Sequence, residues 1–178
     1  MLMLGHCHYH GRGVLRDYAA AVNCYRRAAA SGEPFASYWL GLCVLRGDGV
    51  TQDFTAAAVL FRDAANLGVG NARFELGRCY FSGLGVARDW PQSYRWLTLA
   101  DGLTDDYLSR EKCEKIESMI HQMSPSDVSA GKALLTPEEV EALRSRPKPQ
   151  TPEEMRNALY VMLSGTGSTP KESGPTSE

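Results

Sequence analysis

The sequence carries little excess charge of either sign and contains no long apolar run. Its 178 residues include 19 lysines and arginines against 21 aspartates and glutamates, a formal net charge of −2. Nucleic-acid-binding domains usually carry a clear basic excess, so this balance argues against that class of protein. A membrane-spanning helix needs about 20 consecutive apolar residues, and no stretch approaches that length. The sequence therefore predicts neither nucleic-acid binding nor a membrane span.

One pattern occurs three times at constant spacing. A Leu-Gly pair is followed by Gly-x-Gly-Val and then an aspartate, from Leu4 to Asp17, from Leu40 to Asp53 and from Leu76 to Asp89. Each copy begins 36 residues after the previous one. A fixed period of this length is typical of solenoids, in which each unit buries its apolar face by stacking on its neighbours. The pattern therefore predicts a stacked array that presents a surface.

Each period is expected to fold as a helix, a glycine turn and a second helix. In the middle copy, apolar side chains follow the spacing of an amphipathic helix at Ala36, Leu40, Cys43 and Val44. Gly47 and Gly49 end this helix and form the turn, and Asp53 caps an alanine-rich second helix. A glycine inside the first helix costs about 1 kcal/mol relative to alanine. Its recurrence at positions 5, 41 and 77 predicts a close helix contact.

The glycines, the valine and the aspartate that coincide in three copies resemble the Sel-one-like repeat family, a subset of the tetratricopeptide-like helical hairpins. The resemblance covers residues 1–102 and, more loosely, the helices that follow. It implies an all-α fold, an α/α superhelical solenoid of three 36-residue helix-turn-helix repeats with a concave inner face and C-terminal capping helices. Members act as adaptors and scaffolds, and as bacterial proteins at host or envelope interfaces. The family shares no single activity, so the resemblance implies a role and no chemistry.

The third copy departs from the others and is followed by a different kind of sequence. Ser93 stands where the other copies have alanine, as expected of a terminal repeat with a polar outer face. Residues 103–145 are expected to form capping helices, with an apolar stripe up to Met123 and N-caps at Ser124 and Thr136. Residues 146–178 are expected to contain a linker, a short amphipathic helix over 152–163 with a third N-cap at Thr151, and a disordered tail.

The start of the chain and its five cysteines bear on the compartment. The first repeat lacks the opening turn of its helix, which predicts a sequence truncated at its start; a natural start that frays is the alternative. Met1 to Leu4 run directly into repeat positions, so no cleavable signal peptide is predicted. Cysteine recurs once per repeat, at Cys7, Cys43 and Cys79, without the second partner found in secreted, disulfide-bearing relatives. We expect buried thiols and a cytoplasmic location; a secreted or envelope location stays open if an upstream signal peptide is missing.

The run His6-Cys7-His8-Tyr9-His10 has some features of a metal site, because His6 and His10 lie one helical turn apart. Both histidines align with variable positions of the other copies, and no fourth ligand is evident nearby. We therefore expect no metal and no cofactor, with His6 and His10 as the candidates if a metal binds. The repeated aspartates are explained as helix caps, so no catalytic constellation is left and we expect no enzymatic activity.

The expected concave face is the best candidate for a functional surface. On the first helix of each repeat, the positions opposite the buried stripe are unusually apolar and aromatic for exposed positions. The candidate partner-binding residues are Tyr38, Leu42, Phe74, Arg78, Tyr9, Leu45 and Phe81. Aromatic anchors with an arginine at one end suit an extended or helical peptide. For Tyr9, Leu45 and Phe81, which align with one another, packing between adjacent repeats is the alternative.

The sequence thus predicts a non-enzymatic protein–protein interaction module, an adaptor or scaffold that binds a partner protein or peptide on the concave face of the solenoid. Two alternatives stay open. One is an envelope or secreted repeat protein with ligand-binding or hydrolytic activity related to β-lactams, which some relatives of the family suggest. The other is a structural segment of a longer scaffold. The oligomeric state and the identity of the partner are left open.

Overall fold

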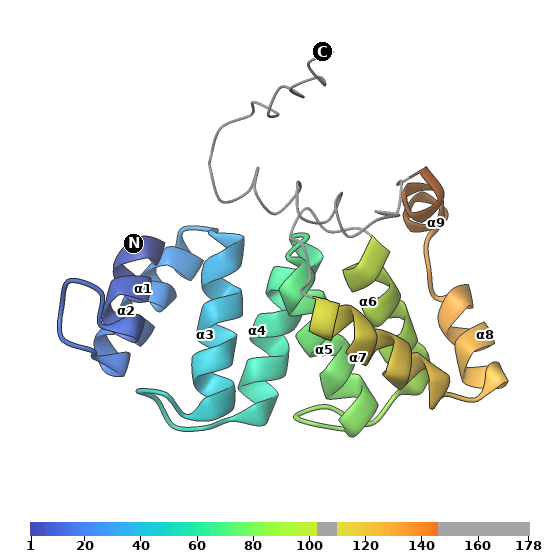
Figure 1. Ribbon diagram of the computed structural model, residues 1–178, viewed down its shortest axis with the longest axis horizontal. Helices are drawn as coiled ribbons and strands as arrows, with labels where there is room; N and C mark the ends of the chain where they lie inside the picture. Colours follow the sequence, from blue (N-terminus) through green and yellow to red (C-terminus); the bar gives the residue numbers. More distant parts are fainter. Residues whose placement is uncertain (103–109, 146–178) are drawn as a thin grey trace, which may run out of the picture. The chain divides into compact units, whose positions relative to one another are not determined.

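The computed structural model describes residues 1–102 and 110–145, with the backbone alone at 101, 102, 110 and 113. Regular structure in these ranges is entirely helical. Three hairpins follow one another: α1 (Leu2–His10) with α2 (Tyr18–Ala30), α3 (Pro34–Arg46) with α4 (Phe54–Asn66), and α5 (Gly70–Ser82) with α6 (Trp90–Gly102). They are followed by α7 (Arg110–His121), α8 (Pro125–Ala133) and α9 (Pro137–Ser145). The predicted all-α repeat fold is confirmed (Figure 1).

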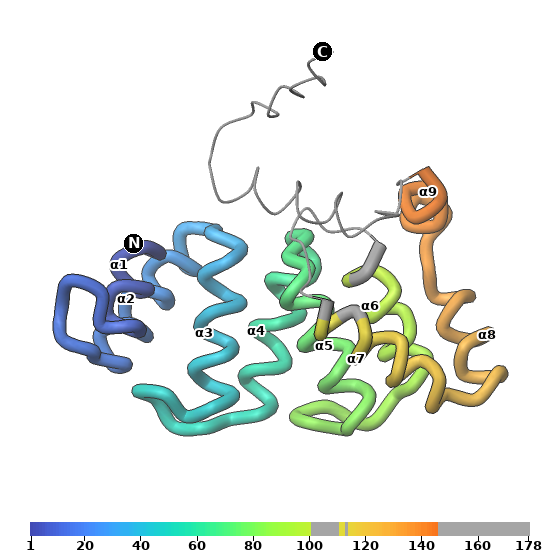
Figure 2. Tube along the Cα trace, in the orientation of Figure 1, coloured from blue at the N-terminus to red at the C-terminus, as the bar shows by residue number. Residues whose placement is uncertain are grey.

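The helices of the hairpins pack mainly on their neighbours in sequence. Within a hairpin the two helices lie against each other, and between hairpins α2 packs on α3 and α4 on α5. Figure 2 traces the same order, with the hairpins side by side from the N-terminal end. Contacts restricted to neighbouring units are what define a solenoid, so each hairpin depends on the next for the burial of its apolar side chains.

The turn inside each hairpin is built as the sequence predicts. Gly47 ends α3 in the left-handed conformation, with φ of 78°, which glycine adopts without the steric cost of a side chain. The Asp53 side chain accepts a hydrogen bond of 3.0 Å from the backbone N–H of Ala56 and caps α4. Asp17 and Asp89 cap α2 and α6 in the same way, at 2.9 and 2.8 Å. The predicted capping role of the three aspartates is confirmed.

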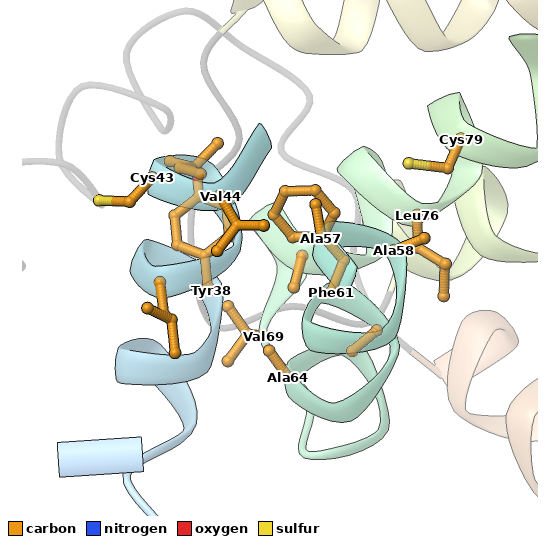
Figure 3. Packing of buried hydrophobic residues seen from close by; sticks show 14 of the residues in the cluster. Tyr38, Cys43, Val44, Ala57, Ala58, Phe61, Ala64, Val69, Leu76 and Cys79 are labelled. Atoms are coloured by element: carbon orange, nitrogen blue, oxygen red, sulfur yellow. The ribbon is translucent and has the colours of Figure 1, made fainter. Parts of the chain in front are cut away.

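The glycine inside each first helix allows the two helices of a hairpin to approach closely. Phe61 of α4 is fully buried against Tyr38 of α3, with ring centroids 6.2 Å apart (Figure 3). A Cβ at Gly41 would lie 2.7 Å from Cε1 of Phe61, closer than carbon atoms pack. The equivalent glycines meet the equivalent side chains, Gly5 against Tyr25 and Gly77 against Leu97. The predicted close contact is confirmed, and a large buried side chain of the second helix is its partner.

The second glycine of each turn brings successive hairpins together. A Cβ at Gly49 would overlap the backbone of Tyr18, at the start of α2 in the preceding repeat. A Cβ at Gly85 would overlap the backbone of Phe54, at the start of α4. These two glycines have φ of 70° and 72°. The turn of one repeat therefore touches the first turn of the second helix in the repeat before it, backbone against backbone.

Ser93 shows that the third repeat is not closed by a polar outer face. Its side chain is fully buried, and its hydroxyl donates a hydrogen bond of 2.8 Å to the carbonyl oxygen of Gly77. The prediction that Ser93 marks an exposed face is therefore wrong. The serine is tolerated in the core because its one polar group has a partner there, and this hydrogen bond joins α6 to α5.

The other side of α6 is covered by α8. The two helices pack closely, and a Cβ at Gly131 would lie 2.7 Å from Cδ1 of Tyr94. Arg95 of α6 donates to the carbonyl oxygen of Leu134 at 3.1 Å and pairs with Glu139 of α9 at 2.6 Å. The C-terminal end of the repeat array is thus closed by a helix that packs on α6 as α5 packs on α4.

Two of the three predicted N-caps lie in the described residues. Ser124 starts α8 with a capping box, in which it exchanges hydrogen bonds with Asp127. Thr136 and Glu139 exchange the corresponding bonds at the start of α9, at 3.2 and 2.9 Å. The third start, at Thr151, lies outside the described residues, as do the expected helix over 152–163 and the expected disordered tail.

The two turn glycines Gly13 and Gly49 offer a matched test of the contact between hairpins. Their φ angles are nearly equal, 73° and 70°, but a Cβ at Gly13 would meet nothing within 4 Å. Substitution by alanine adds left-handed strain of about 1–2 kcal/mol at both. We expect Gly49→Ala to lose a further ~1–3 kcal/mol from overpacking, as measured by urea unfolding followed by circular dichroism. Equal losses would show that the contact contributes nothing to stability.

Candidate functional site

Three of the seven predicted partner-binding residues are buried. Tyr38, Leu42 and Phe74 have exposed fractions of 7%, 6% and 2%. The expectation that these side chains are exposed is wrong. A first helix inside the stack contacts its own partner helix and also the preceding hairpin, so only a narrow part of its circumference faces solvent. Tyr38 and Leu42 accordingly belong to the main core.

Phe74 is buried for a different reason, because α7 contributes to its surroundings. Phe74 shares a second core cluster with Ile116 of α7 and with Met123. Two cations flank its ring: Lys112 Nζ lies 5.5 Å and Arg78 Cζ 5.9 Å from the ring centroid. The helix expected to close the end of the array therefore also covers part of the first helix of the third repeat.

Tyr9, Leu45 and Phe81 are half-buried and make packing contacts. The Tyr9 hydroxyl donates to Asp48 at 2.8 Å and accepts from Arg46 at 3.1 Å, both in the second repeat. Burial and the bond to Asp48 raise the pKa of Tyr9, so its hydroxyl stays protonated. Leu45 packs against the main core, and Phe81 stacks on Trp90 with ring centroids 6.1 Å apart. Tyr9 thus packs between adjacent repeats, which is the alternative that the sequence left open for this residue.

We define a first-helix strip by four side chains of the first helices that are at least partly accessible: His6, Trp39, Arg46 and Arg78. His6 of α1 meets the ring of Trp39 of α3 edge to face, with centroids 4.7 Å apart. The side chain of Arg78 is 49% exposed and pairs with Glu75 at 2.7 Å. The strip combines aromatic edges on α1 and α3 with guanidinium groups on α3 and α5, a combination frequent in protein interfaces.

Arg46 links the repeats electrostatically. Burial by itself lowers the pKa of Arg46, but the neighbouring Tyr9, Asp48 and Glu75 together raise it above its ordinary value. These neighbours come from all three repeats, so the guanidinium group interacts electrostatically with each of them. Sequence reasoning identified Arg78 and missed Trp39 and Arg46. The signal that could have found them is variation, because both positions differ in each copy while the positions of Leu40, Gly41 and Cys43 carry one residue type.

The histidine run folds as an aromatic cluster. His6 Nδ1 lies 3.1 Å from the Tyr25 hydroxyl, and the rings of His6 and His10 are 6.4 Å apart. Burial and the charge of His10 lower the pKa of His6, so the neutral ring is favoured. Within residues 1–102 and 110–145, no three His, Cys, Asp or Glu side chains are grouped so as to hold a metal ion.

Two of the repeated thiols are buried. Cys43 and Cys79 have exposed fractions of 0% and 3%, whereas Cys7 at the equivalent site is half-buried. Burial raises the pKa of each of the two buried thiols to about 11, so they are neutral near pH 7 and are poor nucleophiles. Cys7, Cys24, Cys43 and Cys79 are all free thiols. The side chain of Cys113 lies outside the described residues.

Among the described helices, none combines the length and the apolar character that crossing a membrane requires.

The comparison with protein families decides the class of the chain. The model of the Sel1 repeat matches residues 1–33, 34–69 and 70–100. The chain belongs to the Sel1 repeat family. The matched segments correspond to the three hairpins α1–α2, α3–α4 and α5–α6, which confirms the predicted resemblance. Sel1 repeat proteins generally serve as scaffolds for protein interactions.

Solved structures of other Sel1-type proteins are similar in fold. A protective antigen present in uropathogenic Escherichia coli strains is 26% identical, with a TM-score of 0.66 over 98% of this chain. The chain spans only 34% of the length of that antigen. A Sel1 repeat protein from Oxalobacter formigenes is 27% identical, with a TM-score of 0.57, covering 66% of this chain and 85% of its own. No curated protein sequence matches the chain.

Thiol labelling distinguishes the buried cysteines from the accessible ones. In the folded protein we expect iodoacetamide to modify Cys24, which is half-buried, long before Cys43 and Cys79. The buried thiols are shielded and their raised pKa leaves little thiolate. Labelling of these two should accelerate as the pH rises toward 11, or when urea unfolds the chain. Peptide mass spectrometry gives the order; early modification of Cys43 in mildly alkaline buffer would contradict the observed burial.

Truncation of the Phe74 side chain should lower the free energy of unfolding. Phe74→Ala removes a side chain that is 2% exposed, and such substitutions typically lose about 3–5 kcal/mol. Arg78→Ala, on the same helix but with an exposed side chain, should lose less than ~1 kcal/mol, as expected for a surface ion pair. Chemical unfolding of the two variants measures the difference. Similar losses would mean that Phe74 is not part of the core.

Proposed function

We propose that this Sel1 repeat protein is a non-enzymatic adaptor that binds a partner protein or peptide along the first helices α1, α3 and α5. The observation that carries the proposal is the first-helix strip. The positions of Leu40, Gly41 and Cys43 carry the same residue in all three repeats, whereas the positions of the strip differ from repeat to repeat. Variation at exposed positions of a constant scaffold gives each repeat its own contact, as expected of a recognition surface.

The chemistry of the first-helix strip favours a peptide with aromatic or apolar side chains at one end and carboxylates at the other. His6 and Trp39 offer ring edges, and Arg46 and Arg78 offer guanidinium groups that bind carboxylates well. Of the residues predicted from the sequence, Arg78 remains a direct contact in this proposal. Tyr9, Leu45 and Phe81 border the strip, while Tyr38, Leu42 and Phe74 support it from within the core.

The thiols support a reducing compartment for this function. Cys43 and Cys79 are buried among apolar side chains as free thiols, which suits a small hydrophobic role. A disulfide-stabilised secreted scaffold would need paired cysteines in each hairpin. We therefore place the protein in the cytoplasm, where its partner would also be found.

Charge reversal on the strip tests the proposal. A displayed peptide library is selected on the wild-type protein, and the enriched peptides are then titrated against the double variant Arg46→Glu and Arg78→Glu by fluorescence anisotropy. We expect binding to weaken at least tenfold, equivalent to about 1.4 kcal/mol, because two attractive groups become repulsive toward carboxylates.

The control is Arg62→Glu, which makes one such charge reversal at an exposed position of α4, a second helix. It should bind the selected peptides as the wild type does. Circular dichroism of all variants checks that the fold is intact. If Arg62→Glu weakens binding as much as the double variant, or if neither does, the first helices are not the binding surface.

A further inference from the structure

We propose that the contact between His6 of α1 and Tyr25 of α2 is acid-sensitive and makes the first hairpin responsive to pH. In neutral solution the two side chains share a hydrogen bond inside the hairpin, and a proton taken up by the imidazole disrupts it. Acidification then loosens α1 from α2 and α3, while the hairpins α3–α4 and α5–α6 stay closed.

The Tyr25 hydroxyl depends on His6 for its hydrogen bond. The Tyr25 side chain is fully buried, and burial raises the pKa of its hydroxyl, which therefore keeps its proton. The hydroxyl oxygen lies 3.1 Å from Nδ1 of His6, its only hydrogen-bond partner among the described residues. Because the tyrosine hydrogen has no other acceptor there, the hydroxyl donates and Nδ1 accepts, so the neutral imidazole carries its proton on Nε2.

A proton on Nδ1 of His6 is incompatible with this arrangement. The imidazolium is a donor at both nitrogens, so the Tyr25 hydroxyl would have to turn and accept, and its hydrogen would point into the core without a partner. A buried donor without an acceptor loses its hydration without compensation. An imidazolium at the half-buried position of His6 is also partly removed from water. Both effects favour an open state in which the two groups are hydrated.

The surroundings of His6 act in the same direction. The pKa of His6 lies below its ordinary value of 6.5, first because of burial and then because of the charges of His10 and Arg12. The ring meets Tyr25 of α2 and Trp39 of α3, with centroids 5.5 and 4.7 Å apart, and neither of these rings carries a charge.

The polar groups that α3 and its turn bring to this junction do not offset the effect. Arg46 and Asp48 are bonded to the Tyr9 hydroxyl. Cys43 is a buried thiol whose pKa is raised to about 11, so it is neutral. Within the part of the chain that the structure describes, no carboxylate forms an ion pair or a hydrogen bond with His6, so nothing there holds the imidazolium in the closed state.

The direction of the pKa shift fixes the pH range of the effect. Well above pH 6.5, the ordinary pKa of histidine, His6 is neutral in both the closed and the open state, and the contact is at full strength. Below that pH the open state takes up the proton more readily than the closed state. Opening therefore becomes more favourable as the pH falls.

The second repeat has the same two positions without an ionisable group. Leu42 and Phe61 stand where the first repeat has His6 and Tyr25, and both are buried in the core. In the third repeat a leucine replaces the tyrosine, so the hydrogen bond has no equivalent there either. The acid-sensitive contact is thus confined to the first repeat.

Opening at this contact would also act on the first-helix strip. When α1 moves away, Tyr9 loses its hydrogen bonds with Arg46 and Asp48, and the guanidinium group of Arg46 is no longer held. This consequence for partner binding rests on the proposed function, whereas the opening itself does not. The experiment below uses no partner, so its failure would leave the proposed function standing.

Hydrogen exchange followed by NMR tests the contact in the full chain. Between about pH 7.5 and about pH 5.5, the range in which histidine changes its charge, we expect the protection factors of the α1 amides to fall several-fold relative to those of α5. In the same samples the imidazole of His6 should titrate below pH 6.5. Equal changes in α1 and α5 would overturn the proposal. A pKa of His6 above 6.5 would also overturn it, and would mean that the Trp39 ring stabilises the imidazolium.

Two variants remove the titrating group and keep the contact. The double variant His6→Leu and Tyr25→Phe copies the apolar pair of the second repeat, and His6→Gln supplies a neutral acceptor for the Tyr25 hydroxyl. Both should keep the circular dichroism of the wild type and lose the acid-dependent fall in α1 protection. The control is His121→Gln, which removes an exposed histidine of α7 and should retain the fall. If His6→Gln keeps the acid response, or if His121→Gln abolishes it, the proposal is wrong.

Discussion

Backbone contact between a turn glycine and the first turn of a helix sets the distance between successive hairpins. At Gly49 and Gly85 there is no room for a side chain, so the spacing of the stack is fixed by main-chain atoms and not by adjustable side chains. The small residues along α2 and α4 follow from this spacing, since larger ones would push the hairpins apart. This contact explains the constant 36-residue period, because an insertion within a repeat would shift the turn glycine away from the helix that it contacts.

Because the hairpins are spaced so closely, only part of the surface of each first helix is accessible to solvent. Tyr38 and Leu42 end in the core, and the accessible side chains are those that differ among the repeats. The division between core and surface changes from repeat to repeat, because Leu42 is buried while its equivalents His6 and Arg78 are accessible. The hydrogen bonds of Tyr9 with Asp48 and Arg46 cross the junction between two repeats and hold these side chains in place, so the binding surface that we propose would be preorganised.

The sequence predicts local features well and the exposure of side chains poorly. Caps at Asp17, Asp53 and Asp89 depend on a few neighbouring residues, and the close approach at Gly41 is signalled by the energetic penalty of a mid-helix glycine. The exposure of Phe74 depends instead on α7, whose position the repeat pattern does not encode. The prediction that Ser93 is exposed is wrong for a similar reason, since the hydrogen-bond acceptor of its hydroxyl is a carbonyl oxygen on another helix. The apolar stripe does not single out Trp39 and Arg46, because their positions depend on contacts with side chains of the preceding repeat.

The chain order of the helix contacts also shapes how the protein opens. A hairpin with a neighbour on each side, such as α3–α4, is held by two junctions, while α1–α2 is held by one. In a one-dimensional array the free energy of local opening follows the number of junctions lost. Among the described helices, the amide protons of α1–α2 should therefore exchange with solvent through a partial opening that leaves α3–α4 and α5–α6 folded.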